Sequence, residues 1–236
     1  MNESDAQGIR LAKRVAALAE CSRREAELLI ENGAVRVDGA VVLVPQARVL
    51  PTQHVAIEAG AQAVPVSPVT LLLHKPAGMA TETAHRLLVA ANHHEPERAG
   101  LRFLPRHVAA QRCMTPLETE ASGLVVFTQE WRIERRLQED AALLEHELIV
   151  DVAGPVGPEA LARLDRAPAR VSVSQQAEGH TGLRFAVKGL QPGQIAQQCQ
   201  CAGLRLLGIR RLRIGRVALS GLLGGQWRYL LPHERF

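Results

Sequence analysis

The chain has 236 residues, of which 47% are hydrophobic but only 3% aromatic, so a core can form but must be built from aliphatic side chains. Its apolar stretches are shorter than the roughly 18 residues of a membrane span, and its first residues lack the apolar segment of a secretory signal. The four cysteines are scattered, which predicts reduced thiols, no metal site and a cytoplasmic protein.

The net charge of +4 is unevenly distributed along the chain. Residues 181–236 hold 9 Lys and Arg side chains against a single acid. Grouped guanidinium groups fit a phosphate backbone through bidentate hydrogen bonds and counterion release. The alternative is a strand edge kept soluble by charge, which would need fewer charges. We therefore predict that a polyanion is bound by Arg205, Arg210, Arg211, Arg213 and Arg216.

Residues 1–60 are predicted to form a small domain of two helices and a hairpin. Apolar residues recur at helical spacing over 9–19. A second helix begins at Ser22, which forms a capping box with Glu25, and ends at Asn32-Gly33. The Asp38-Gly39 pair between valines then predicts a tight hairpin.

The two predicted helices bring five basic side chains to one side of this domain: Arg10, Lys13, Arg14, Arg23 and Arg24. Residues 9–57 resemble the alpha-L RNA-binding motif, with its specific parts in the Ser22–Ala26 run and the Gly33–Gly39 hairpin. The resemblance implies RNA binding through the basic helical face. The alternative is that these side chains only solvate a helix.

Residues 61–69 are predicted to be a linker, and 70–236 a second domain. Strands are expected at 70–74, 147–152 and 183–189, in the segment 204–217 and at the end of the chain. Helices are expected before residue 147, at 158–166 and at 192–203. Because most strands are not joined by helical crossovers, the sequence predicts an α+β fold with a mixed or antiparallel sheet.

Two carboxylates, Glu118 and Glu120, lie just before a Ser122-Gly123 turn signal and the apolar run 124–127. This places a carboxylate pair on a tight loop at the mouth of a buried strand. Rigid loops of this kind often carry catalytic groups.

The order of these elements resembles the bacterial ribosomal RNA pseudouridine synthases that carry an N-terminal alpha-L module, especially the branch acting on large-subunit RNA. The resemblance implies a mostly antiparallel sheet with flanking helices and a cleft for RNA and a flipped uridine. It also implies an isomerisation of uridine to pseudouridine that needs no cofactor. The residues that carry it are His74-Lys75-Pro76-Ala77-Gly78, Leu117, Ser122-Gly123-Leu124, Gly203, Arg213-Ile214, Leu219-Ser220-Gly221 and Gly225-Gln226-Trp227-Arg228.

The chain departs from the family pattern at three catalytic positions. The essential aspartate of the family falls on Glu118, the tyrosine that stacks on the uracil falls on Leu148, and the arginine that pairs with the aspartate falls on Ala196. A reacting group misplaced by about 1 Å can cost 10²-fold or more in rate. Lys75, within the first family motif, is predicted to contact RNA.

These departures predict an RNA-binding protein, monomeric and with lost or strongly reduced isomerase activity. One alternative is an active synthase that uses Glu118 as its catalytic carboxylate. Another is a ribosome assembly or quality-control factor. Structured, most simply ribosomal, RNA is the predicted partner in each case, without a membrane.

Overall fold

The computed structural model describes residues 8–94, 100–101 and 103–236. They fall into two compact units. The first is built from residues up to Ser67 together with the segment ending at Ala109, and the second from Pro68–Leu101 and Ala110–Phe236. None of the helices in the described ranges has the length and apolar composition of a membrane span.

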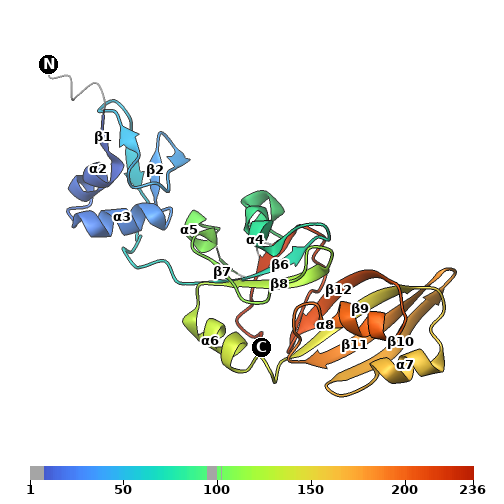
Figure 1. Ribbon diagram of the computed structural model, residues 1–236. Helices are drawn as coiled ribbons and strands as arrows, with labels where there is room; N and C mark the ends of the chain where they lie inside the picture. Colours follow the sequence, from blue (N-terminus) through green and yellow to red (C-terminus); the bar gives the residue numbers. More distant parts are fainter. Residues whose placement is uncertain (1–7, 95–99, 102) are drawn as a thin grey trace. The chain divides into compact units, whose positions relative to one another are not determined.

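The first unit packs two helices against short strands (Figure 1). The capping box predicted for the second helix is present, since Glu25 N donates to Ser22 Oγ and Ser22 N donates to Glu25 Oε2. The predicted hairpin is also present, with Asp38 and Gly39 at φ of 49° and 83°. The elements are β1 (Ile9–Arg10), α2 (Leu11–Leu18), α3 (Arg23–Glu31), β2 (Val35–Val37), β3 (Ala40–Val41), β4 (Arg48–Val49), β5 (Val55–Ile57) and, inserted from later in the chain, α5 (Pro105–Val108).

The core of the first unit lies between its helices and strands. Leu11 and Val15 of α2, Ile30 of α3 and Val35 of β2 are fully buried there. The basic side chains of the two helices therefore face away from this core or along its rim. Strand β1 pairs with β4, and this pairing sets Arg10 opposite Arg48.

The second unit is built on one large sheet with the order β10-β11-β9-β12-β8-β6-β14. Its strand pairs are antiparallel except for β12 with β8, which confirms the predicted α+β, mostly antiparallel fold. The strands are β6 (Thr70–Lys75), β7 (Arg112–Cys113), β8 (Ser122–Thr128), β9 (Glu145–Ala153), β10 (Ala169–Ala177), β11 (His180–Lys188), β12 (Leu206–Ile214), β13 (Val217–Ala218) and β14 (Trp227–Tyr229).

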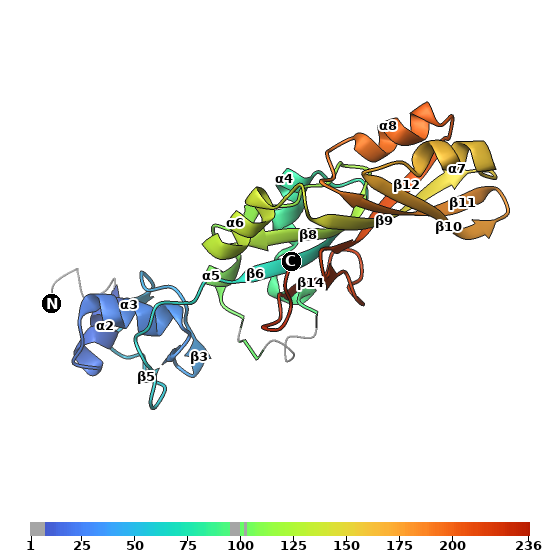
Figure 2. The ribbon, with the colours of Figure 1, turned by 90° about the horizontal axis from the view of Figure 1, so that it is seen from below.

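Helices cover the sheet of the second unit. Helices α7 and α8 lie on one face of β9, β10 and β11 (Figures 1 and 2), where their side chains share a core with Phe185 and Val150. Helix α6 packs with β6, β8 and β13 around a second core. The helical segments are α4 (Thr81–Ala84), the 3₁₀ turns His85–Leu87 and Ala90–Asn92, α6 (Trp131–Glu139), α7 (Pro158–Leu164) and α8 (Gln194–Cys201).

The segment 204–217, expected to be one or two strands, forms two: the nine-residue strand β12 and the short strand β13. One long strand of this unit was missed. Strand β10 was not predicted. Its outer six residues are all exposed and mostly polar, so they carry no alternating burial signal.

The parallel contact of β12 with β8 requires a glycine at position 123. Gly123 has a φ of +114°, and a Cβ built on it would lie 2.3 Å from the carbonyl oxygen of Arg211. Replacing it with alanine forces two backbones apart at the base of the carboxylate loop.

We expect Gly123→Ala to destabilise the second unit by roughly 3 kcal/mol, because strain and backbone overlap add. The matched control is Gly179→Ala, whose φ is +81° but whose Cβ would meet no atom within 4 Å. It should cost only about 1 kcal/mol. Urea unfolding followed by tryptophan fluorescence reports on this unit, since the two tryptophans, Trp131 and Trp227, both lie in it. Equal losses of stability for the two variants would contradict the close approach of the backbones.

Candidate functional site

A buried lysine binds the backbone of the carboxylate loop, residues Met114–Ser122. Lys75 is fully buried at the end of β6. Its Nζ donates to the carbonyl oxygens of Pro76 at 3.1 Å, Met79 at 2.6 Å and Thr119 at 3.1 Å. All three protons of the ammonium are thus satisfied by backbone carbonyls. Lys75, predicted to contact RNA, is instead placed where it ties the loop after β6 to the carboxylate loop.

A buried arginine holds the other side of the same loop. Arg211 of β12 is 2% exposed. Its Nε donates to the carbonyl of Leu124 at 2.8 Å, and its Nη2 donates to the carbonyl of Thr115. Thr81 adds a further tie, because its hydroxyl bonds both the carbonyl and the N–H of Leu117. The loop is therefore fixed by side chains from β6, α4 and β12.

Burial and nearby charged groups shift the pKa values of both buried cations, Lys75 and Arg211. Burial lowers the pKa of Lys75, while Glu118 and Glu120 raise it. Burial lowers the pKa of Arg211 to about 10, and Cys113 and Glu118 oppose that change. Arg211 remains charged at neutral pH. Glu118 thus has positive neighbours in Lys75 and Arg211 although position 196 is alanine.

The carboxylate of Glu118 has a specific partner of its own. Its Oε1 accepts a hydrogen bond from the backbone N–H of Gly193, the residue that precedes α8. Carboxylates are favoured at helix N-termini, where backbone N–H groups lack partners within the helix. Glu118 therefore caps α8 from the carboxylate loop. Among the described residues, the side chain of the neighbouring Glu120 makes no hydrogen bond or ion pair.

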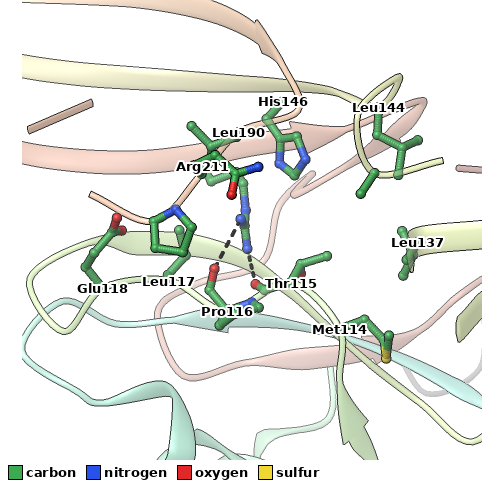
Figure 3. Close-up of a pocket in the computed structure, with 13 residues that line it drawn as sticks. Met114, Thr115, Pro116, Leu117, Glu118, Leu137, Leu144, His146, Leu190 and Arg211 are labelled. Atoms are coloured by element: carbon green, nitrogen blue, oxygen red, sulfur yellow. Dashed lines mark hydrogen bonds between the residues drawn. The ribbon is translucent and has the colours of Figure 1, made fainter. Parts of the chain in front are cut away.

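Glu118 lies between two cavities. The larger, a cleft of about 680 Å³, is lined by Glu120, Asp151, Ala196 and Arg210 as well as by Glu118. The smaller pocket, of about 130 Å³, is lined by Met114–Glu118 of the same loop (Figure 3). It combines apolar walls with the guanidinium of Arg211.

The smaller pocket also contains a neutral histidine. His146 of β9 is 8% exposed and its Nδ1 is buried without a hydrogen-bond partner among the described residues. Burial, with the nearby charge of Arg211, lowers the pKa of His146 to about 3. Figure 3 shows its ring beside Arg211, with Leu144 and Leu137 along the far wall. Sequence analysis missed this residue, because its burial follows from the packing of β9.

The position expected for an aromatic platform lies in the hydrophobic core. Leu148 is 1% exposed and packs in the cluster that contains Phe185, Ile195 and Cys199. It lines neither cavity beside Glu118. Ala196, in contrast, does line the larger cleft, where it contributes only a methyl group.

The five arginines predicted to form one polyanion site are separated by the structure. Arg211 is buried, and Arg213 is paired with Glu145 at 2.8 Å and Glu147 at 2.7 Å. Arg205 precedes β12 and Arg216 follows it, so a strand about 30 Å long lies between them. Arg210 alone of the five lines the larger cleft. Arg210 and Arg213 line one hollow, but the five side chains do not form a single cluster, since a strand sends successive side chains in different directions. Polyanion binding by these arginines stays a prediction.

The first unit contains a basic hollow of about 670 Å³, lined by Gly8, Ile9, Arg10, Lys13, Ala16, Arg23 and Arg48. The structure brings Arg10, Lys13 and Arg23 together here as predicted, and adds Arg48. Local patterns could not reveal Arg48, because it reaches the hollow through the pairing of β4 with β1. Among the described residues no acidic side chain lines the hollow.

Two predicted basic residues do not line the basic hollow. Arg24 lies 3.7 Å from Glu27, and Arg14 is half-buried on α2. Arg23 contacts Glu27 as well, at 3.3 Å, but Arg23 and Arg24 both remain largely exposed. Within the described ranges no group of three or more His, Cys, Asp or Glu side chains could hold a metal ion.

Comparison with known proteins identifies the two units. Residues 9–55 match the family model of the S4 domain. Over 96% of its length the chain is 25% identical to an "Uncharacterized RNA pseudouridine synthase" of Aquifex aeolicus, covering 94% of that protein. It is 25% identical to "Ribosomal large subunit pseudouridine synthase B" of Bacillus subtilis, over 95% of this chain and 93% of that protein.

A further relative and a solved structure point to the same family of proteins. The chain is 26% identical to the "Dual-specificity RNA pseudouridine synthase RluF" of Escherichia coli, over 96% of this chain and 77% of the relative. A solved structure described as "pseudouridylate synthase" shares the fold with a TM-score of 0.57 and 18% identity, over 94% of this chain and 96% of that one. The chain therefore has an S4 domain and the pseudouridine synthase fold, and over nearly its full length it is similar to RNA pseudouridine synthases.

Proposed function

We propose that this chain is an RNA-binding member of its family in which isomerisation of uridine is lost or strongly reduced. The observation that carries the proposal is the hydrogen bond from Gly193 to Glu118. The carboxylate at the catalytic position is engaged in capping α8, so attack on a nucleotide would require it to leave a helix terminus.

The surroundings of Glu118 support the same proposal. A flipped base in the cleft would find the methyl group of Ala196 where the family has arginine. It would also lack an aromatic platform, since Leu148 is buried in the core. Stacking of a base on an aromatic ring contributes roughly 1–3 kcal/mol. Without it, a flipped base would be held and oriented less firmly in the cleft.

RNA binding is supported by the basic hollow. Arg10 and Arg48 face each other across β1 and β4, an arrangement of like charges that is unfavourable without an anion. Phosphate groups would relieve this repulsion and release counterions. Because two relatives are named for modification of RNA and of the large ribosomal subunit, structured ribosomal RNA is the partner we propose for a monomeric, cytoplasmic protein.

One observation favours a second candidate, an active synthase that uses Glu118. The buried charges of Lys75 and Arg211 lie close enough to interact with Glu118, so this carboxylate has positive neighbours although position 196 is alanine. The role of a ribosome assembly or quality-control factor is compatible with the first proposal, because it requires RNA binding but no turnover.

The first prediction concerns turnover. The full chain, incubated with ribosomal RNA transcripts, should form no pseudouridine above background, at least about 10²-fold below a working enzyme that turns over on the order of 1 s⁻¹. Carbodiimide labelling followed by primer extension detects the product at single nucleotides. Pseudouridine that disappears in Glu118→Gln would contradict the proposal and establish the second candidate.

The second prediction concerns Glu118 as a helix cap. Glu118→Ala and Glu118→Asp should each lower the free energy of unfolding by roughly 1 kcal/mol, because alanine lacks and aspartate is too short for the bond to Gly193. Glu118→Asp alone should remain inactive. Glu120→Ala, which removes an exposed carboxylate on the same loop that caps no helix, is the control and should lower the free energy of unfolding by less than either Glu118 variant. A robustly active Glu118→Asp variant would show that this account of the site is wrong.

The third prediction concerns the basic hollow. Arg10→Ala with Lys13→Ala should weaken RNA binding and reduce the slope of log K against log salt by about 0.7–0.9 for each phosphate that the variant no longer neutralises. Arg36→Ala is the matched control: it lies in the same unit, its guanidinium donates to the carbonyl of Gly39, and it does not line the hollow. Identical slopes for the double variant and the control would mean that these side chains only solvate the helix.

A further inference from the structure

The 130 Å³ pocket beside the carboxylate loop contains two deeply buried polar side chains. Arg211 and His146 both line it and are 2% and 8% exposed. Buried polar groups are nearly always hydrogen-bonded, so each exception indicates a partner that is missing. Both side chains keep hydrogen-bonding capacity that the described residues do not use.

The guanidinium of Arg211 has N–H groups to spare. Its Nε donates to the carbonyl of Leu124 at 2.8 Å, and its Nη2 donates to the carbonyl of Thr115. Its Nη1 reaches the carbonyl of Pro116 only at 3.5 Å. A guanidinium has five N–H donors, so two of them lack a partner among the described residues. Because Arg211 is shielded from bulk solvent, the pocket that it lines is where these N–H groups can meet an acceptor.

His146 adds a further donor to the same pocket. Its ring lies beside Arg211 (Figure 3), and its buried Nδ1 makes no hydrogen bond among the described residues. Burial and the charge of Arg211 lower the pKa of His146 to about 3, so the imidazole is neutral at neutral pH. A neutral imidazole can carry its single proton on Nδ1 and donate it. The guanidinium and the imidazole can therefore donate to one acceptor held between them.

The charge inside the pocket favours an acceptor that is negative. In the described part of the chain the guanidinium of Arg211 is hydrogen-bonded to neutral carbonyls alone. Glu118 is the one acidic side chain among the described lining residues, but it is exposed and its Oε1 accepts from Gly193. Figure 3 shows the Glu118 carboxylate at the end of the pocket opposite His146. The buried positive charge near His146 is therefore left without an anion in contact with it.

The size and the walls of the pocket limit what this anion can be. Its volume is about four times the share of one water molecule in the liquid, about 30 Å³, so it accepts a ligand of a few heavy atoms. Leu137 and Leu144 form an apolar wall near the imidazole (Figure 3). A short-chain carboxylate fits both features, because its two oxygens pair well with a guanidinium and its alkyl group can contact the leucines.

We propose that this pocket binds a short-chain carboxylate, such as acetate, between the guanidinium of Arg211 and Nδ1 of His146. This site goes beyond RNA binding and does not depend on it. The ligand neutralises the buried charge and accepts the hydrogen bonds that the protein leaves unmade. Leu190 and Pro192, which precede α8, line the pocket together with the carboxylate loop. An occupied pocket therefore joins that loop to the segment that leads into α8.

The test follows the ring protons of His146 by NMR while sodium acetate is added to the full chain, against sodium chloride at the same concentration. The resonance is assigned as the one that is missing from His146→Leu and His146→Asn. Acetate should shift it in a saturable manner with a dissociation constant on the order of 1 mM, typical of so small a ligand. The melting temperature should rise in parallel, because acetate binds the folded state. Acetamide, the neutral analogue, should do neither.

The variants separate the site from a general effect of salt. His146→Leu should weaken acetate binding roughly tenfold in the thermal assay, because a hydrogen bond to an ionised group is lost. His146→Asn, whose amide can donate from nearly the same place, should bind more tightly than His146→Leu. His233→Leu, an exposed histidine outside the pocket, is the matched control and should bind acetate as the unaltered chain does.

Three results would overturn the assignment. They are a shift with acetamide equal to that with acetate, unchanged acetate binding by His146→Leu, and a crystal structure grown in acetate with only water in the pocket. The crystal structure requires no variant, so it decides the question even where substitutions at position 146 prevent folding.

Discussion

The second unit depends on two buried positive charges that are satisfied by backbone carbonyls. Burying a charge is costly unless it is hydrogen-bonded, and neither Lys75 nor Arg211 is ion-paired with a carboxylate in the described residues. Each is solvated instead by backbone carbonyls, most of which belong to the carboxylate loop and the loop after β6. The carboxylate loop has its shape because these cations need its carbonyls. Lys75 and Arg211, which hold the carboxylate loop, are therefore different residues from the one at the catalytic position, Glu118. The loop can keep its shape when the residue at position 118 changes.

Strand β12 shows how one strand distributes its arginines among different tasks. Arg210 and Arg211 point to opposite sides, as the period of two requires. Simple alternation would send Arg213 to the same side as Arg211. The register of β12 against β9 shifts between these two residues, and this irregularity turns Arg213 toward Glu147. One bulge thus separates the arginine that supports the carboxylate loop from the arginine paired on the open face of the sheet.

The sequence predicted those features that local signals determine. The capping box at Ser22 and the Asp38-Gly39 turn were confirmed because each depends on residues three or fewer positions apart. The α+β class followed from the succession of elements. The burial of Arg211 and the cap that Glu118 makes could not be predicted, because they join residues 96 and 75 positions apart. The directions of the arginine side chains in segment 205–216 could not be predicted for the same reason, since composition records the charges but not where a bulged strand sends them.

The division between anchors and catalytic positions explains how RNA binding can outlast isomerisation. The phosphate binding proposed for the basic hollow would use Arg10, Lys13, Arg23 and Arg48, which belong to the first unit. None of these four side chains is among those that hold the carboxylate loop of the second unit. When two binding units share one chain, the second unit binds at the effective concentration set by their linkage, so modest affinities multiply. Substitutions at the catalytic positions remove transition-state interactions but leave this linkage intact. Selection for RNA binding alone would therefore maintain the S4 unit, Lys75 and Arg211, and would not require the catalytic residue types of the family at positions 118, 148 and 196.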